Sequence, residues 1–380
     1  MIKNRETFYL SGYDPRGSRH YYNLYKKESA KEKEKGTDFH ISKRKRTDKH
    51  TSSWSIKLND TKTNYHFLEW DDIIRKDWKK NFFSLFIDMI VALNHYVFSG
   101  VIFKYAKASP VQMIAAFYPV AYLLGTIYIT YTLSLILYGF LSIYTNFVLS
   151  TIISMLVGFT ILTLLTKIGN KFAVFWLLRV YTFAIKYVKG DVELENRIEE
   201  FATLIANTIQ DSETKNIDEI LIISHSVGTI ITIPILEKAF AKLNLDSNLK
   251  SKISILTLGE CIPVVSFLPK ADSYRESMKK LSSYDDICWI DYTTPIDGAC
   301  FPLLDYYKCS NIETTNKPNY LSPRFHTLFS KSGYSKLRKN RYLTHFVYLM
   351  STELDGVYNF FKISAGKQPL YYYLPKKEQK

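Results

Sequence analysis

Apolar and polar residues are distributed unevenly along this chain, and the pattern divides it into three regions. Residues 1–80 alternate short apolar runs with polar, Gly- and Pro-containing stretches, which indicates strands joined by loops. Residues 81–190 consist mainly of long apolar runs, and residues 191–380 return to the mixture of a soluble domain. We therefore predict that the first and third regions form one domain, into which a membrane segment is inserted.

In the two outer regions, short apolar runs alternate with amphipathic stretches of helical spacing. The runs predict strands at residues 7–10, 38–46, 53–57, 64–69, 220–223, 253–258 and 287–292. The spacing predicts helices at residues 18–35, 192–210, 227–242 and 273–280. The alternating Lys and Glu residues that end the first helix are typical of a solvated face. Strands that alternate with helices favour an α/β fold, with a mostly parallel sheet flanked by helices.

The middle region contains a long stretch without charge. No charged residue occurs between Lys107 and Lys167. Because about 20 apolar residues cross a bilayer, this stretch is too long for one crossing. It predicts a hairpin of two transmembrane helices, near residues 111–136 and 147–166, with an uncharged turn around residues 138–146.

Basic residues flank the hairpin on both sides and set its orientation. Lys104 and Lys107 precede the first span, and two further lysines, Lys167 and Lys171, follow the second. The positive-inside rule then places both outer regions in the cytoplasm, and we expect a bacterial inner membrane. Residues 81–98 and 172–188 predict interfacial helices, with Arg179 and Lys186 reaching anionic headgroups. A third crossing at residues 172–188 is the alternative.

Composition adds a preference for anionic partners. The 380 residues carry a net charge of +14, which suits an anionic membrane surface or nucleic acid. The basic run at residues 43–46 suggests nucleic acid, but a solvated face or a contact to lipid headgroups explains it more simply. We therefore expect membrane lipids as partners and no nucleic acid. The four cysteines lack metal-binding spacing, and no nucleotide-binding glycine motif occurs, so we expect no metal and no cofactor.

The strand predicted at residues 220–223 leads into Ser224, His225, Ser226, Val227 and Gly228, and a helix follows. This stretch resembles the GlyXSerXGly motif of the α/β-hydrolase family, with serine in place of the first glycine. In that family a tight turn between strand and helix lifts the serine hydroxyl above the sheet. The alternative is a buried strand that ends in an N-capping serine before an ordinary helix.

The resemblance implies an acid and a histidine that follow the serine in the chain. Asp297, in a turn after the strand at residues 287–292, is the candidate acid, and His345, before a helical apolar run, is the candidate base. Three aspartates remain alternatives for the acid: Asp291, Asp305 and Asp286. His326 is the alternative base. His225 is a poor candidate, because a residue adjacent to the nucleophile points elsewhere.

The resemblance also implies two backbone donors for an oxyanion. One is the N–H of Val227, and the other should come from the loop after the first strand, where Gly12, Tyr13 and Asp14 lie, with Tyr13 as the candidate. The whole chain thus resembles an α/β-hydrolase with an inserted transmembrane hairpin and flanking interfacial helices. That resemblance implies a membrane-bound serine esterase or lipase acting on a lipid or other acyl ester. An inactive membrane scaffold with the same fold, and a lipid acyltransferase, remain alternatives.

Overall fold

A computed structural model describes residues 1–78, 81–314 and 316–375 of the chain. The chain forms two compact units, one of Met1–Trp78 with Tyr187–Lys380 and the other of Lys79–Lys186. The sequence predicted an inserted segment at residues 81–190. The predicted boundary at residue 80 lies outside the described residues.

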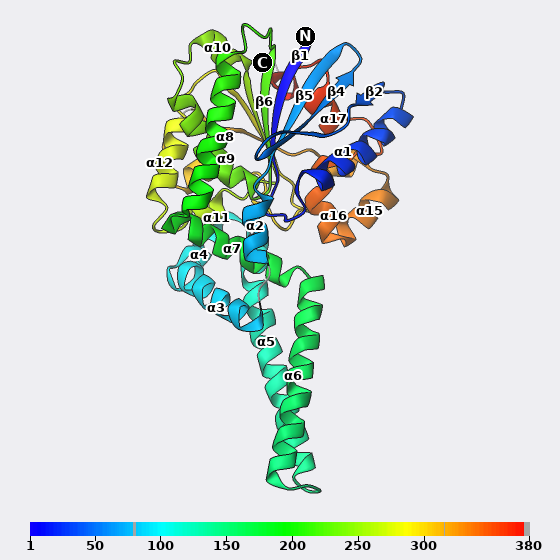
Figure 1. Ribbon diagram of the computed structural model, residues 1–380, viewed down its shortest axis with the longest axis vertical. Helices are drawn as coiled ribbons and strands as arrows, with labels where there is room; N and C mark the ends of the chain where they lie inside the picture. The colour runs from blue at the N-terminus through cyan, green and yellow to red at the C-terminus, as the bar shows by residue number, and fades with distance from the viewer. Residues whose placement is uncertain (79–80, 315, 376–380) are drawn as a thin grey trace. The chain divides into compact units, whose positions relative to one another are not determined.

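The first unit is built on a mixed, mostly parallel sheet. Its described residues contribute nine strands in the order β2-β4-β5-β1-β6-β7-β8-β9, with β3 paired to β4 (Figure 1). The strands are β1 (Asn4–Leu10), β2 (Phe39–Ile41), β3 (Lys45–Asp48), β4 (Thr51–Leu58), β5 (Thr61–Leu68), β6 (Glu219–His225), β7 (Ile253–Leu258), β8 (Cys288–Tyr292) and β9 (Asn319–Leu321). All neighbours from β5 to β9 run parallel, and β2, β3 and β5 pair antiparallel with β4.

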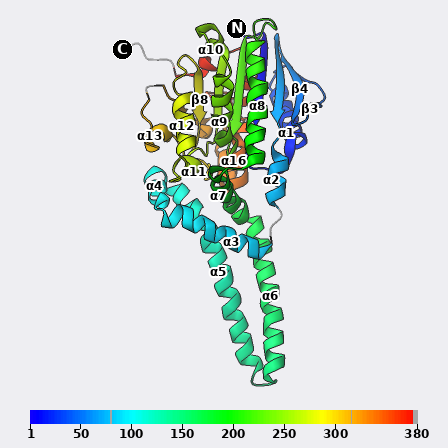
Figure 2. The ribbon, with the colours of Figure 1, turned by 60° about the vertical axis from the view of Figure 1, so that its left-hand side comes forward.

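Helices cover both faces of this sheet, which confirms the predicted α/β class with a mostly parallel sheet. One face carries α8 (Val192–Gln210), α9 (Gly228–Ala241) and α12 (Asp272–Leu281), which pack side by side (Figure 2). The other face carries α1 (Gly17–Glu34) and a C-terminal group of short helices. That group consists of α14 (Phe325–Leu328), α15 (Lys331–Lys339), α16 (Arg341–Phe346), η2 (Val347–Leu349), α17 (Phe360–Ala365) and η3 (Leu370–Tyr373).

Successive side chains of a strand point to opposite faces of the sheet, so residues at alternate positions pack on the same side. Tyr9, Leu221, Ile223 and Leu256 point into the cluster beneath α1 and the C-terminal helices. Every residue of β6 is buried, because this strand is central and covered on both faces. Four short helices complete the unit: α2 (Asp71–Trp78), α10 (Ser247–Lys252), α11 (Pro263–Ser266) and α13 (Tyr306–Cys309).

The second unit is helical. Its elements are α3 (Phe82–Ala92), the π-helical η1 (Leu93–Phe98), α4 (Val101–Ala108), α5 (Pro110–Leu141), α6 (Phe147–Lys171) and most of α7 (Val174–Lys189). Among the described residues, two single helices are long and apolar enough to span a membrane, α5 and α6. This confirms the two long apolar helices that the sequence predicts. The 16-residue α7 is not one of them.

Small residues let α5 and α6 pack closely along their length (Figures 1 and 2). The buried positions Ser150, Ser154 and Gly158 recur every fourth residue of α6 and so lie on one face. A Cβ atom at Gly158 would collide with the side chain of Ser134 on α5. The hydroxyl of Tyr122 adds an interhelical hydrogen bond of 2.7 Å to the carbonyl of Leu165. Such close contact through small residues is typical of helices that associate within a bilayer.

Two expectations about charged residues are wrong in part, because Lys33, Glu34 and Lys35 at the end of α1 are exposed as expected but other residues are not. Arg179 is buried at 6% exposure, so its side chain does not extend to lipid headgroups, whereas Lys186 is exposed. On α1, Glu28 and Glu32 are each 1% exposed and do not lie on a solvated face. Both carboxylates accept hydrogen bonds from Ser351, because the C-terminal segment packs over this part of α1.

Candidate active site

Ser226 occupies a tight turn between β6 and α9. Its φ of 56° lies in the left-handed region, which residues with a side chain rarely adopt. The turn is held by the hydrogen bond from the Ser226 N–H to the carbonyl of Leu258, at 2.9 Å. The helix begins two residues later at Gly228, so Ser226 is not the N-cap of an ordinary helix.

Residues with little or no side chain surround this turn. A Cβ atom at Gly228 would lie 2.6 Å from the carbonyl oxygen of Ser11, and one at Gly12 would lie 2.8 Å from the Cβ of Ser226. Ser224, at the position of the first glycine in the resembling motif, is fully buried between β1 and β7. The close approach of strand, helix and loop therefore explains why this stretch contains small residues.

The structure brings Ser226, His345 and Asp297 together in one hydrogen-bonded chain. Nε2 of His345 lies 2.9 Å from Oγ of Ser226. Nδ1 of His345 lies 3.0 and 3.1 Å from the two carboxylate oxygens of Asp297. All three side chains are almost fully buried. This is the geometry in which a histidine can accept the serine proton while a carboxylate fixes its tautomer.

Asp297 and His345 reach this place from different elements. Asp297 follows β8 in a loop whose Ala299 N–H donates to its Oδ1 at 3.0 Å. His345 lies in α16, which follows β9 after two short helices. Because parallel strands end at the same edge of the sheet, these segments converge on the end of β6.

The alternative residues lie elsewhere or have other partners. Asp291 accepts a hydrogen bond from Thr257 on β7, and Asp305 caps α13. Asp286 and His326 are exposed.

The loop after β1 lies against the serine, as expected for an oxyanion loop. Gly12 packs directly on Ser226, and Tyr13 follows it, with its ring buried against Trp70 and Trp78. Within the described residues, no acceptor lies in hydrogen-bond reach of the Val227 N–H. The roles of Val227 and Tyr13 as oxyanion donors stay predictions.

Arg16 connects this loop to the helix that carries His345. Its guanidinium donates to both carboxylate oxygens of Asp14, and it lies 5.4 and 5.2 Å from the ring centres of Tyr342 and Phe346 on α16. Burial acts to raise the pKa of Asp14, but the hydrogen bonds and charge of Arg16 outweigh it and hold that pKa below its usual value. Sequence reasoning missed Arg16, because no local motif shows which distant rings it contacts.

His225 also contacts the candidate base. Its Nε2 lies 2.8 Å from the backbone carbonyl of His345, and the two rings are 4.8 Å apart. Burial, followed by the charge of His345, lowers the pKa of His225 to about 3. The ring is therefore neutral at pH 7. The sequence prediction that His225 is not the base agrees with this placement, since Nε2 faces a carbonyl and not Ser226.

A buried group of acids and a thiol lies behind the serine. Burial raises the pKa of Asp291 to about 7, and burial together with the charge of Asp291 raises that of Glu260 well above its ordinary value. The Sγ of Cys261 is 3.8 Å from Oγ of Ser226, and burial raises the pKa of this thiol as well. Cys261 is thus a protonated neighbour of the serine and not a competing nucleophile.

Replacing Asp291 with asparagine should change how stability depends on pH. Because the pKa of Asp291 is raised in the folded protein, its carboxyl stabilises the fold fully below about pH 4, the pKa of an aspartate in the unfolded chain. This stabilisation is lost as the pH rises through about 7. Asparagine keeps the shape without the charge. We expect the melting temperature of Asp291→Asn, relative to wild type, to be higher at pH 8 than at pH 5 by at least about 2–4 °C. An equal difference at both pH values would contradict the assignment.

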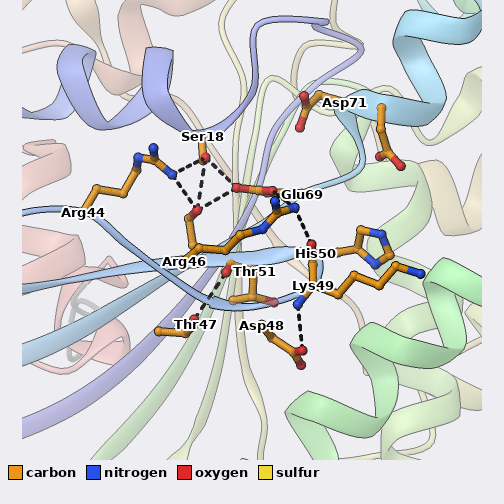
Figure 3. Close-up of polar contacts among 12 residues, drawn as sticks. Ser18, Arg44, Arg46, Thr47, Asp48, Lys49, His50, Thr51, Glu69 and Asp71 are labelled. Carbon is orange, nitrogen blue, oxygen red and sulfur yellow. Dashed lines mark hydrogen bonds and ion pairs between the residues drawn. The ribbon is translucent and has the colours of Figure 1, made fainter.

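A separate cavity of about 620 Å³ lies beside β3 and α2, away from the three side chains. Its charges are largely paired within the protein: Arg46 with Glu69 at 3.4 Å, and His50 with Glu200 at 2.8 Å. Arg44 donates to the hydroxyls of Ser18 and Ser52 (Figure 3). Arg44 is half-buried, whereas Lys43, Lys45 and Arg46 are exposed, so most of the basic run at residues 43–46 is a solvated face, as expected.

No family model, no curated protein and no solved structure matches this chain. Among the residues that the structure describes, no group of three His, Cys, Asp or Glu side chains is placed to hold a metal ion.

Proposed function

We propose that this chain is a membrane-bound serine hydrolase of the α/β-hydrolase type that cleaves acyl esters. The observation that carries the proposal is the continuous hydrogen-bonded chain from Ser226 Oγ through His345 to Asp297, with distances of 2.9 and 3.0 Å. The left-handed turn at Ser226 supports it, because strained backbone of this kind recurs at active sites and here it occurs at the serine that contacts His345.

The reaction begins when His345 Nε2 takes the proton of Ser226 and Oγ attacks the acyl carbonyl carbon. The tetrahedral oxyanion then accepts hydrogen bonds from the N–H of Val227 and from the loop at Tyr13. As the ester bond breaks, His345 gives its proton to the leaving alcohol, and an acyl-enzyme remains on Ser226. Water, deprotonated by His345, attacks this ester and releases a carboxylic acid. Asp297 holds the imidazole and stabilises its charged form.

We further propose that the ester belongs to a membrane lipid and that the hydrolase unit is cytoplasmic. Two helices of the length and apolar character of membrane spans support the first point. The lysines that flank α5 and α6 support the second.

The test is covalent labelling of the full-length protein in detergent micelles with a small alkyl fluorophosphonate. We expect stoichiometric labelling of wild type, no labelling of Ser226→Ala, and loss of ester hydrolysis in the same variant. Ser224→Ala is the matched control. It removes the hydroxyl of another buried serine, two positions earlier at the end of β6, and should label normally. Equal labelling of wild type and Ser226→Ala would exclude Ser226 as the nucleophile.

A further inference from the structure

We propose that His225 is a positioning residue, whose Nε2–H holds the backbone of His345 so that the imidazole of His345 stays in line with Ser226. The inference rests on the proposed function, because it assigns a role within the same site. It concerns a residue that sequence reasoning considered only as a base.

Two consecutive residues, the last of β6 and the first of the turn that follows it, contact His345 at two points. His225 is the last residue of β6, and Ser226 is the first residue of the turn. His225 Nε2 lies 2.8 Å from the main-chain oxygen of His345, and Ser226 Oγ lies 2.9 Å from its ring Nε2. Register with β1 and β7 fixes the end of β6. The same strand end therefore fixes both the position of Ser226 and the position of the His345 backbone, and so the distance between serine and histidine.

The element that carries His345 needs such support. α16 has only six residues, Arg341–Phe346, and an isolated helix of this length is not stable. The last turn of a helix leaves carbonyls without intrahelical donors, and the carbonyl of His345 belongs to this turn. His225 donates to this carbonyl from a strand far away in sequence, and its ring also packs against Phe346, with 5.4 Å between ring centres.

The protonation state of His225 suits this role. A carbonyl oxygen only accepts, so the neutral ring must carry its hydrogen on Nε2, and Nδ1 is left bare. His225 is 1% exposed, and its Nδ1 has no hydrogen-bond partner within the described residues. A second positive charge beside His345 would oppose its protonation during the reaction. His345 receives the proton of Ser226 because its Nε2 lies 2.9 Å from the serine Oγ, and a neutral His225 adds no charge that opposes this transfer.

The experiment compares two side chains of similar length at position 225. His225→Gln keeps an amide N–H donor, whereas His225→Met removes it and keeps an apolar fill. The measurement is the rate constant for fluorophosphonate labelling of full-length protein in micelles, normalised to the final extent of labelling. The melting temperature of each variant is measured as well. We expect His225→Met to label about 10–100-fold more slowly, since small displacements at a reacting pair have effects of this size. The labelling rate constant of His225→Gln should lie within about fivefold of the wild-type value.

His225→Phe repeats the removal of the donor with an aromatic ring, in case methionine impairs folding. His326→Phe is the control, because His326 is exposed and should leave the rate unchanged. Folded His225→Met or His225→Phe that labels at the wild-type rate would overturn the proposal. So would folded His225→Gln that is as slow as His225→Met. Failure of the proposed function has a different signature, in which wild type itself does not label at Ser226.

Discussion

Asp297→Asn is expected to lower kcat for ester hydrolysis by about 10³–10⁴-fold while leaving the protein folded. Asp297 accepts a hydrogen bond from Nδ1 of His345, at 3.0 and 3.1 Å to its two oxygens. An asparagine amide can present its N–H to Nδ1, which favours the tautomer whose proton sits on Nε2. That tautomer cannot accept the proton of Ser226. Steady-state hydrolysis of a soluble p-nitrophenyl ester measures the effect.

A matched control for this variant is Asp286→Asn. Asp286 is exposed, and its φ of 65° is a conformation that asparagine also tolerates. We expect its kcat to equal that of wild type. If Asp297→Asn reduced kcat by less than about tenfold, Asp297 would not be the residue that orients His345.

Arg5→Ala should lower the free energy of unfolding of the unit that contains the sheet by about 3–5 kcal/mol. Arg5 and Glu219 are register partners on β1 and β6, with a closest N–O distance of 2.6 Å and almost no exposed side-chain surface. Arg5 also donates to the carbonyls of Gly366 and Gln368 at 2.8 Å. Its removal leaves the carboxylate of Glu219 buried without a cation. Urea unfolding in micelles measures the change.

The double variant Arg5→Met with Glu219→Met separates the cost of an unpaired charge from the value of the pair. Replacing both partners of a buried ion pair by apolar residues is often close to neutral. We therefore expect the double variant to unfold at a higher urea concentration than Arg5→Ala. If it were less stable than Arg5→Ala, the loss would come from the hydrogen bonds to the C-terminal segment and not from the buried charge.

The parts of the fold that could be predicted are those encoded in local patterns. The apolar run at β6, with the small residues Ser224 and Gly228 two positions before and after Ser226, indicates a buried strand and a tight turn, and both are present. Asp297 and His345 could be chosen by their order after the serine. The uncharged stretch gave both apolar helices, although α5 and α6 extend beyond the predicted limits at residues 136 and 166.

The remaining features depend on contacts between distant segments, which a local pattern does not contain. Glu28 and Glu32 have the spacing of a solvated helix, yet the segment around Ser351 covers them. β9 has only three residues and lacks an apolar run, so nothing marks it before β8 is in place beside it. The contact of His225 with His345 joins residues 120 positions apart.

The strand order of the sheet has a consequence for the synthesis of the protein. β1 lies between β5, which precedes the apolar helices in the chain, and β6, which follows them. During synthesis, α5 and α6 therefore leave the ribosome before β6 is made. Until then one edge of β1 has no partner strand. Such an edge pairs readily with other chains. If α5 and α6 enter a membrane as they emerge, they do so while β1 has only β5 as a partner, and the end of β6 that leads into Ser226 can join the sheet only after that step.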